Sequence, residues 1–423
     1  MRIQAFRNLL SPLASLFAIV LIAATAWSQE TVLYSFSDPN GDVLPQAGVI
    51  SDANGNLYGT TFYGGTYGMG TVYELSPGAN GWTETILHSF NVDGIDGFFP
   101  TGSLIFDSAG NLFGTAQFGG TGNCSVGFGC GVIFKLSPAG NGSWNETILH
   151  DFMGSDGWQV HAGLVFDSKG NLYGTTANGG AFGWGTVFEL SPAKNGSWTL
   201  KQLHSFSGGM EGGVPYGTVV LDSAGNIYGL AYEGGGVSSE CRYGCGTVFE
   251  LIRGQNRKHW TGKVLHNFTT SSGDGHYPYG SVVFDKQGNL YATASAGGGS
   301  SDSGIVFELS PSSSGEWNET VIHNFNDSAT DGAGPSAGLV FDSAGNLYGT
   351  TISGGSDGQG TVFELTPAGG ATWTESILHS FSNQQVDGYN PNGGLMLDKA
   401  GNLYGVTDNG GQNQDGAVFE VAH

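Results

Sequence analysis

The sequence predicts an all-β chain folded as one seven-bladed β-propeller with four antiparallel strands per blade. The pattern Asp-x-x-Gly-Asn-(Leu/Ile)-(Tyr/Phe) occurs seven times, at intervals of 55 to 63 residues, and such long-period self-similarity is typical of repeat architectures. Each repeat contains short β-branched and aromatic runs bounded by Gly, Pro, Asn or Asp, as strands and tight turns do. With 75 Gly among 423 residues, the chain is also poorly suited to helices.

Every repeat supplies four strands in the same order, and the sixth illustrates them. Its first strand (338–342, Gly-Leu-Val-Phe-Asp) and second strand (346–350, Asn-Leu-Tyr-Gly-Thr) are joined by the Asp-x-x-Gly-Asn turn, in which Asp accepts backbone N–H groups and Gly or Asn takes positive φ. A Gly-Gly loop leads to the third strand (360–365), and the fourth runs from Trp to Phe (373–381). We expect the aromatic residue of the second strand to pack between blades; it recurs as Tyr58, Phe113, Tyr173, Tyr228, Tyr291, Tyr348 and Tyr404.

The two ends of the repeat region complement each other. A copy of the fourth strand at 31–36 precedes any first strand, and residues 421–423 follow directly on the seventh third strand. We therefore expect the N-terminal strand to complete the blade formed by residues 393–421, which closes the ring. The domain prediction is a single propeller over residues 29–423.

The N-terminus predicts a signal peptide over residues 1–28. Arg2 and Arg7 precede an apolar stretch at 9–27 that ends in small residues, including Ala26 and Ser28, the order of a secretory signal. Cleavage after Ser28 or after Ala26 fits, and an uncleaved membrane anchor is the alternative. We expect a secreted protein, extracellular or periplasmic, with no membrane span once the signal is removed.

The linked motifs Asp-Ser-Ala-Gly-Asn-Leu-Tyr-Gly-Thr-Thr, Gly-Gly and Gly-Thr-Val-Phe-Glu-Leu resemble the choice-of-anchor tandem-repeat GloVer-containing proteins. The resemblance covers essentially all of residues 31–423. It implies an exported bacterial repeat protein, and it assigns no activity and no catalytic residue. Such proteins often carry a C-terminal anchoring segment, whereas this sequence stops at His423, so the resemblance leaves the mode of attachment open.

Histidine and cysteine recur at defined places in the repeat. Six fourth strands carry a His, which we interpret as a hydrogen-bonded structural residue because these outer strands are far apart; the six are His88, His150, His204, His266, His323 and His379. The four cysteines lie in the loops after the second strands of the two longest repeats, and we expect two local disulfides, Cys124 with Cys130 and Cys241 with Cys245. A zinc site made from all four thiolates is the weaker alternative.

A carboxylate followed by Gly precedes the first strand in six repeats. The loops after the second and fourth strands should share one edge of the ring, here called the upper rim, and these acids lie on it: Asp96, Asp156, Glu211, Asp274, Asp331 and Asp387. Asp-Gly turn chemistry explains them most simply. The functional alternative is a calcium or cationic-ligand ring at the mouth of the central channel. Calcium is the one cofactor that the sequence suggests.

The composition limits the partners. With 36 acidic and 13 basic residues and a net charge of −23, the chain is not suited to nucleic acid, and we expect a monomer that binds a glycan or protein ligand. Residues that break the repeat on the upper rim are the ligand-binding candidates: Trp158, His161, Trp184, Tyr232, Glu233, Arg242, His276 and Tyr277.

Two functions of different kinds follow from this pattern. The first is an exported, non-catalytic binding or scaffold propeller whose ligand, a glycan, peptide or envelope component, lies on the upper rim. The second is a carbohydrate-active enzyme, a glycoside hydrolase or lyase, that uses paired rim carboxylates. No unique set of acid, base and orienting group stands out, so the sequence favours binding and assigns no catalytic residue.

Overall fold

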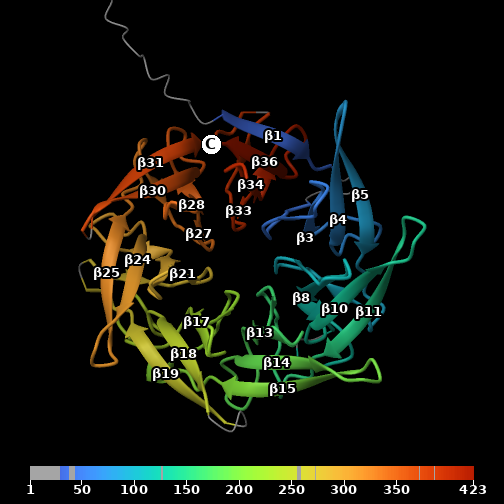
Figure 1. The fold of residues 1–423 in the computed structure, drawn as a ribbon, viewed down its shortest axis with the longest axis horizontal. Helices are drawn as coiled ribbons and strands as arrows, with labels where there is room; N and C mark the ends of the chain where they lie inside the picture. Colours follow the sequence, from blue (N-terminus) through green and yellow to red (C-terminus); the bar gives the residue numbers. More distant parts are fainter. Residues whose placement is uncertain are drawn as a thin grey trace, which may run out of the picture.

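The fold is a closed ring of seven four-stranded antiparallel sheets, or blades, around a central axis (Figure 1). A computed structural model describes residues 29–37, 43–124, 127–254, 259–271, 273–370, 372–384 and 386–423. The predicted signal peptide, residues 1–28, lies outside the described residues. Within them there is no α-helix and only one short 3-10 turn, η1 (Gly209–Glu211). The predicted seven-bladed propeller is confirmed.

Two strands form the inner half of each blade, and they are short. The innermost strands are β2 (Ile50–Ser51), β7 (Ile105–Phe106), β12 (Val165–Phe166), β16 (Val220–Leu221), β21 (Val283–Phe284), β27 (Val340–Phe341) and β33 (Met396–Leu397). The second strands are β3 (Leu57–Thr61), β8 (Leu112–Ala116), β13 (Leu172–Thr176), β17 (Ile227–Ala231), β22 (Leu290–Ala294), β28 (Leu347–Thr351) and β34 (Leu403–Thr407). The turn between them follows the prediction: in blade 1, Asp52 Oδ1 accepts the backbone N–H groups of Asn54 and Asn56, and Gly55 has a φ of 84°.

The outer half of each blade is a longer β-ribbon. The third strands are β4 (Thr71–Gly78), β10 (Val132–Pro138), β14 (Thr186–Pro192), β18 (Thr247–Arg253), β24 (Ile305–Pro311), β30 (Thr361–Gly369) and β36 (Ala417–Ala422). The outermost strands are β5 (Gly81–Ser89), β11 (Trp144–Asp151), β15 (Trp198–Ser205), β19 (Trp260–Asn267), β25 (Trp317–Asn324), β31 (Thr372–Ser380) and β1 (Gln29–Ser35).

The ring closes as the sequence predicts. Strand β1 pairs antiparallel with β36, and the seventh sheet has the order β1-β36-β34-β33, so strands from the two ends of the described chain share one blade (Figure 1). The register shifts between Val32 and Tyr34, where the other outer ribbons also carry a bulge, as between Val72 and Tyr73. Tyr34 therefore occupies the position that His88 has in blade 1.

The hydrophobic core consists of seven clusters, and each lies between two successive blades. The repeated aromatic of the second strand joins blades as predicted: Tyr58 of β3 meets Phe106 and Trp144 of blade 2 edge-on, at ring-centroid distances of 5.0 and 6.5 Å. Because each blade buries its face only against its neighbours, the closed ring removes the two apolar faces that an open stack would expose.

The upper rim carries additional short ribbons and both disulfides. Cys124–Cys130 and Cys241–Cys245 each close a small loop, so the predicted pairing is confirmed. Small two-stranded sheets join the loops of one repeat: β6 (Gly97–Phe98) with β9 (Phe118–Gly119), β20 (Gly275–His276) with β23 (Ala296–Gly297), β26 (Gly332–Ala333) with β29 (Ser353–Gly354), and β32 (Gly388–Tyr389) with β35 (Asn409–Gly410). In the described part of the chain, no helix has the length and apolar character to cross a membrane.

Candidate functional site

The six repeated rim carboxylates pair with the six repeated histidines. In blade 1, His88 Nε2 lies 3.1 Å from Asp96 Oδ2, which also accepts the backbone N–H of Asn91 at 3.1 Å. Each acid accepts a backbone N–H of its turn and also contacts a His in this way. The other His–acid pairs are His150–Asp156 at 2.9 Å, His204–Glu211 at 2.9 Å, His266–Asp274 at 3.4 Å, His323–Asp331 at 3.2 Å and His379–Asp387 at 3.4 Å. The predicted hydrogen bonding of these histidines is confirmed, and their structural role stays a prediction.

At four boundaries between blades, which we call seams, a Glu from the outermost strand of the next blade joins the pair. Glu146 Oε1 of β11 lies 3.5 Å from His88 Nε2, and Glu319 and Glu375 lie 3.7 and 3.6 Å from His266 and His323. Glu30 of β1 completes the set with His379 and Asp387. We call these four sets the seam triads.

Burial governs the charge of the seam triads. Removal from water raises the pKa of Glu30, Glu146, Glu319 and Glu375 to about 7 in each case, against an opposing effect of the neighbouring His. A buried acceptor oxygen on each of these Glu side chains has no hydrogen-bond partner. Two close carboxyl groups in low dielectric favour retention of a proton, so the triads hold protons near neutral pH.

The remaining three seams lack a triad. The position of Glu146 is taken by Leu200 in β15 and by Gly262 in β19. At the seam where the ring closes, Tyr34 replaces His, and its hydroxyl donates to Glu84 Oε2 at 3.0 Å. Four seams with a triad and three seams without one can therefore be compared within the same protein.

The carboxylates predicted to surround the channel mouth lie instead beside the outermost strands. None of the six belongs to the lining of the cavity on the axis, because each acid turns back to the His of the outermost strand that precedes it in the chain. A divalent cation could be held at a seam triad, whose three donor atoms lie within 4.8 Å of one another. His is not a typical calcium ligand, and calcium binding by the six acids stays a prediction for calorimetry.

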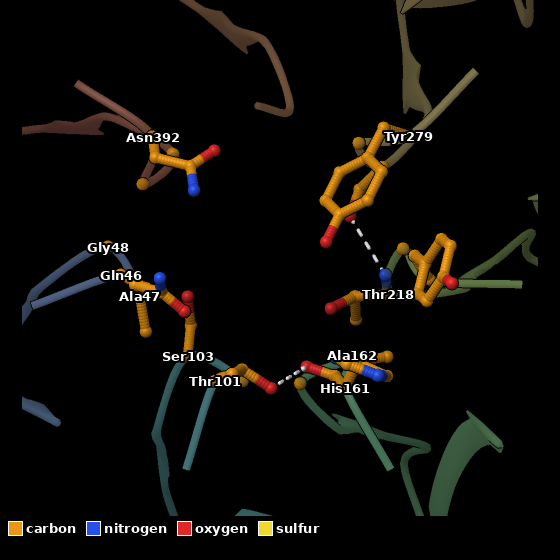
Figure 2. Close-up of a pocket in the computed structure, with 18 of the residues that line it drawn as sticks. Gln46, Ala47, Gly48, Thr101, Ser103, His161, Ala162, Thr218, Tyr279 and Asn392 are labelled. Atoms are coloured by element: carbon orange, nitrogen blue, oxygen red, sulfur yellow. Dashed lines mark hydrogen bonds between the residues drawn. The ribbon is translucent and has the colours of Figure 1, made fainter. Parts of the chain in front are cut away.

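A cavity of about 340 Å³ lies on the axis of the ring. Its wall is formed by the segments that precede the innermost strands, and all seven blades contribute to it (Figure 2). Three residues from each of six blades and one from blade 6 make up most of the lining, together with Phe62 and Gln117 from the loops after β3 and β8. Its size is at the lower end of the range for small-molecule sites.

One position of the repeat, which we call the ring position, is different in almost every copy and always lines this cavity. It lies six residues before the repeat Asp, follows Pro in six of the seven copies, and precedes two small residues. Its occupants around the ring are Gln46, Thr101, His161, Tyr216, Tyr279, Ser336 and Asn392. They are partly exposed, whereas the preceding residue is buried in every blade. The backbone is thus repeated while the side chain directed to the cavity is not.

A left-handed residue sets the backbone for each ring position. Two residues before it, φ lies between 49° and 64° in all seven repeats, at Leu44, Phe99, Gln159, Val214, Tyr277, Gly334 and Asn390. For a residue such as Val214 this conformation is costly. Two hydrogen bonds offset the cost: the Val214 N–H donates to Trp184 O of the preceding blade, and its carbonyl accepts from Tyr232. The wall of the cavity is therefore tied to two blades at once.

Three of the predicted ligand-binding residues belong to one aromatic cluster at the cavity. Tyr216 and Tyr279 stack with centroids 4.9 Å apart, and His161 meets Tyr216 edge-on at 4.9 Å. Tyr232 stacks on Tyr277 at 5.0 Å and touches Tyr216 edge-on at 5.4 Å. Burial lowers the pKa of His161 to about 4, so its ring is neutral at physiological pH.

Of the eight candidates, only His161 belongs to the cavity lining; Tyr232 and Tyr277 are connected to the lining through Tyr216, and the other five lie elsewhere on the rim. Trp158 pairs with Asn178, and Trp184 packs against Gly208 and Gly213. The remaining three have local partners too: Glu233 bridges to Gly213 through its backbone, Arg242 lies over the Tyr243 ring at 5.5 Å, and His276 Nε2 is 3.5 Å from Asp302 Oδ1. These residues pack on their own or a neighbouring blade.

Six residues of the ring position were not among the candidates predicted from the sequence: Gln46, Thr101, Tyr216, Tyr279, Ser336 and Asn392. Most of the predicted candidates lie in the long loops, whereas the ring position follows a repeated Pro just before the innermost strand. An alignment of the seven repeats contains a usable signal. The residue type varies at one position between a Pro and two small residues, which indicates that the side chain there is not needed for the fold.

The fold and the cavity define a tandem-repeat β-propeller with a candidate ligand site on its axis. The sequence profile of the Gloeobacter/Verrucomicrobia repeat matches residues 19–142, 125–340 and 298–423. The chain belongs to this repeat family, which confirms the resemblance seen in its motifs. No curated protein matches the chain significantly.

Proteins of two bacteria are among the solved structures with the same fold. The extracellular domain of the putative hybrid two component system BT4673 from B. thetaiotaomicron is 10% identical, with a TM-score of 0.55 over 93% of this chain and 40% of that chain. PorZ, described as an essential surface component of the type-IX secretion system of Porphyromonas gingivalis, is 15% identical, with a TM-score of 0.54 over 92% of this chain and 47% of that chain. The chain thus spans less than half of either protein, and at these identities the likeness concerns the fold alone.

Proposed function

We propose that this protein is an exported, non-catalytic binding propeller whose ligand lies on the upper rim, over the axial cavity. The observation that carries the proposal is the ring position. Six of seven copies have the same Pro before it and all have small residues after it, yet the side chains facing the cavity differ. A ligand without sevenfold symmetry requires such a difference, whereas packing would favour repetition.

The upper rim has further properties of a binding face. Among the described residues, the exposed large apolar side chains lie in its loops, with the exceptions of Ile86 and Ile252 on strands; the rim set comprises Tyr67, Val92, Ile95, Phe128, Met153, Phe182, Met210, Val237, Tyr243 and Val386. Apolar side chains gathered on one face often mark an interaction site. A glycan, a peptide or an envelope component are the ligands considered.

Export is supported by the two disulfides, because such bonds persist in oxidising compartments. The N-terminal sequence, with its basic start and apolar stretch, adds to this. Fractionation of the native host, with the protein found in the periplasm or outside the cell, tests this part of the proposal; a cytoplasmic protein with reduced cysteines would contradict it.

Binding is tested by calorimetry of the purified protein against glycans, peptides and envelope extracts. A double variant, Gln46→Ala with Asn392→Ala, should lose binding, and Gln287→Ala, at an exposed Gln in the turn between β21 and β22, serves as the matched control. Equal loss in both, or no loss in either, would place the ligand elsewhere.

The enzymatic alternative has its own measurement. Acid–base hydrolysis of a glycoside requires two carboxyl groups beside the sugar, and the described lining of the cavity contains none. Burial raises the pKa of Asp408 to about 7 and raises the pKa of Glu233. Product release from a glycan, abolished by Asp408→Asn or Glu233→Gln, would replace the binding proposal with the enzymatic one.

A further inference from the structure

The lining of the axial cavity carries no formal charge at neutral pH. It contains no Lys, Arg, Asp or Glu among its described residues. Burial keeps His161 neutral by lowering its pKa to about 4. Burial also raises the pKa of Tyr279, and it raises the pKa of Tyr216 to about 12. A charged ligand would leave water without gaining a counter-charge, which is costly.

The two sides of the cavity differ in chemistry. Blades 3 to 5 supply His161, Tyr216 and Tyr279, which are in mutual ring contact. The opposite side, from blades 6, 7 and 1, supplies the hydroxyl and amide groups of Ser336, Asn392 and Gln46. Figure 2 shows Tyr279 across the opening from Gln46, with Asn392 between them along the wall. One face therefore suits flat apolar contact, and the other suits hydrogen bonds.

The polar side is held in a defined orientation. Ser336 Oγ donates to Asn392 Oδ1 at 2.9 Å, and Asn392 Nδ2 is 3.5 Å from Asp408 Oδ2. On the other side of the ring, Gln117 Nε2 lies 3.0 Å from His161 Nε2, and the Thr101 hydroxyl donates to His161 O at 3.1 Å. Polar groups that are fixed before binding lose less entropy when a ligand arrives.

From this arrangement we propose that the axial cavity binds the terminal unit of a neutral glycan. The apolar C–H face of the sugar ring contacts the Tyr216 and Tyr279 side, and its hydroxyl groups hydrogen-bond with Gln46 and Asn392. The proposal rests on the proposed function and adds the ligand class to it.

The alternatives fit the same lining less well. A peptide that enters by its end brings a charged amine or carboxylate, and an acidic glycan or a nucleotide brings an anion into a chain of net charge −23. A purely apolar ligand would cover the Gln46 amide without offering it a hydrogen-bonding group. A neutral saccharide has both an apolar face and many hydroxyl groups, and its non-reducing end carries no charge.

The test is calorimetric titration of the full purified protein with four sets of compounds: neutral oligosaccharides, uronic-acid oligosaccharides, short peptides and nucleosides. We expect neutral oligosaccharides to bind best. Tyr279→Ala should weaken them about tenfold, the effect of losing roughly 1.4 kcal/mol of ring contact, while Tyr279→Phe retains the ring and most of the affinity. Ile86→Ala, at an exposed apolar residue on the outermost strand β5 and outside both the lining and the rim set, is the control and should bind like the parent.

A second variant keeps the test decisive if Tyr279→Ala folds poorly. Gln46→Ala changes a partly exposed side chain and should also weaken neutral oligosaccharides severalfold. Preferential binding of nucleosides, peptides or acidic glycans that is sensitive to Gln46→Ala would overturn the ligand class and leave the proposed binding site standing. Binding by none of the four sets, or binding insensitive to both ring variants, would overturn the axial site itself.

Discussion

The seams between blades and the ring position on the axis are both repeated seven times. Residue types are largely the same from seam to seam, whereas they differ from one ring position to the next. At the seams the same chemistry returns, with a His–acid pair at six of seven boundaries. On the axis the backbone returns while the side chains range from Gln46 to Tyr279. Where a residue stabilises the fold, the same residue type is favoured in every repeat. Where a residue faces a single ligand, each repeat contacts a different part of that ligand.

The first prediction, with the largest expected effect, breaks a seam. His323→Ala removes the ring that contacts both Asp331 and Glu375, and it leaves these two carboxyl groups, only 6% and 12% exposed, beside each other without that partner. We expect a loss of about 3–5 kcal/mol in the free energy of unfolding, as for other broken buried pairs. Denaturant unfolding measures it.

The matched control is His150→Ala. Its partner Asp156 is 24% exposed, and Leu200 stands where the second acid would be. We expect a loss of about 1 kcal/mol there, because one acid with access to water is easily solvated. Equal losses at the two seams would show that the triads have no special energetic role.

The second prediction concerns pH. An acid whose pKa rises from 4.5 in the unfolded chain to about 7 in the folded one, as at Glu319, stabilises the fold below pH 4.5, and this contribution is lost as the pH rises through 7. The free energy of unfolding should therefore fall between pH 5 and pH 8, by about 1–3 kcal/mol for each such acid. Denaturant titrations across this range measure the slope.

Glu319→Gln should flatten that slope, since Gln does not titrate. The exposed Glu316, for which the same substitution is available, is the control and should leave the slope unchanged. Because Glu30, Glu146 and Glu375 still titrate, the slope should decrease without vanishing, and a slope as steep as that of the parent would assign the pH dependence to other groups.

The third prediction builds a triad where the chain lacks one. Leu200→Glu would place an acid beside His150 and Asp156, and Leu200→Gln has the same length without the charge. We expect the Glu variant to lose about 1 kcal/mol more than the Gln variant on passing from pH 5 to pH 8. Identical pH profiles would mean that the surroundings of Leu200 do not reproduce those of Glu146.

The fourth and smallest prediction concerns the ring position. Gln46→Ala and Ser336→Ala, at partly exposed sites, should change the free energy of unfolding by no more than about 0.5 kcal/mol each. Thermal unfolding checks this. A loss as large as that of His323→Ala would mean that the ring position serves the fold, and would remove its variation as an argument for binding.

Much of the architecture could be predicted because it is local in the chain. The Asp-x-x-Gly-Asn turn, the four strands and the two short disulfide loops depend on residues a few positions apart. Closure by residues 29–35 followed from counting strands. The contacts across seams could not be read in this way: Glu146 meets His88 only because two outermost strands of different blades come together, and no motif within one repeat encodes that meeting.

The sequence by itself determined the number of blades, the order of strands and the closing strand, since hydrophobic period and turn chemistry act over short distances. Only the tertiary structure decided what the repeated acids and the varied residues do. Asp96 and its counterparts looked like a ring at the channel mouth, but each turns toward the His of the preceding outermost strand. Gln46, Tyr279 and Asn392, far apart in the chain, face one cavity because closure of the ring brings the seven innermost segments to a common axis.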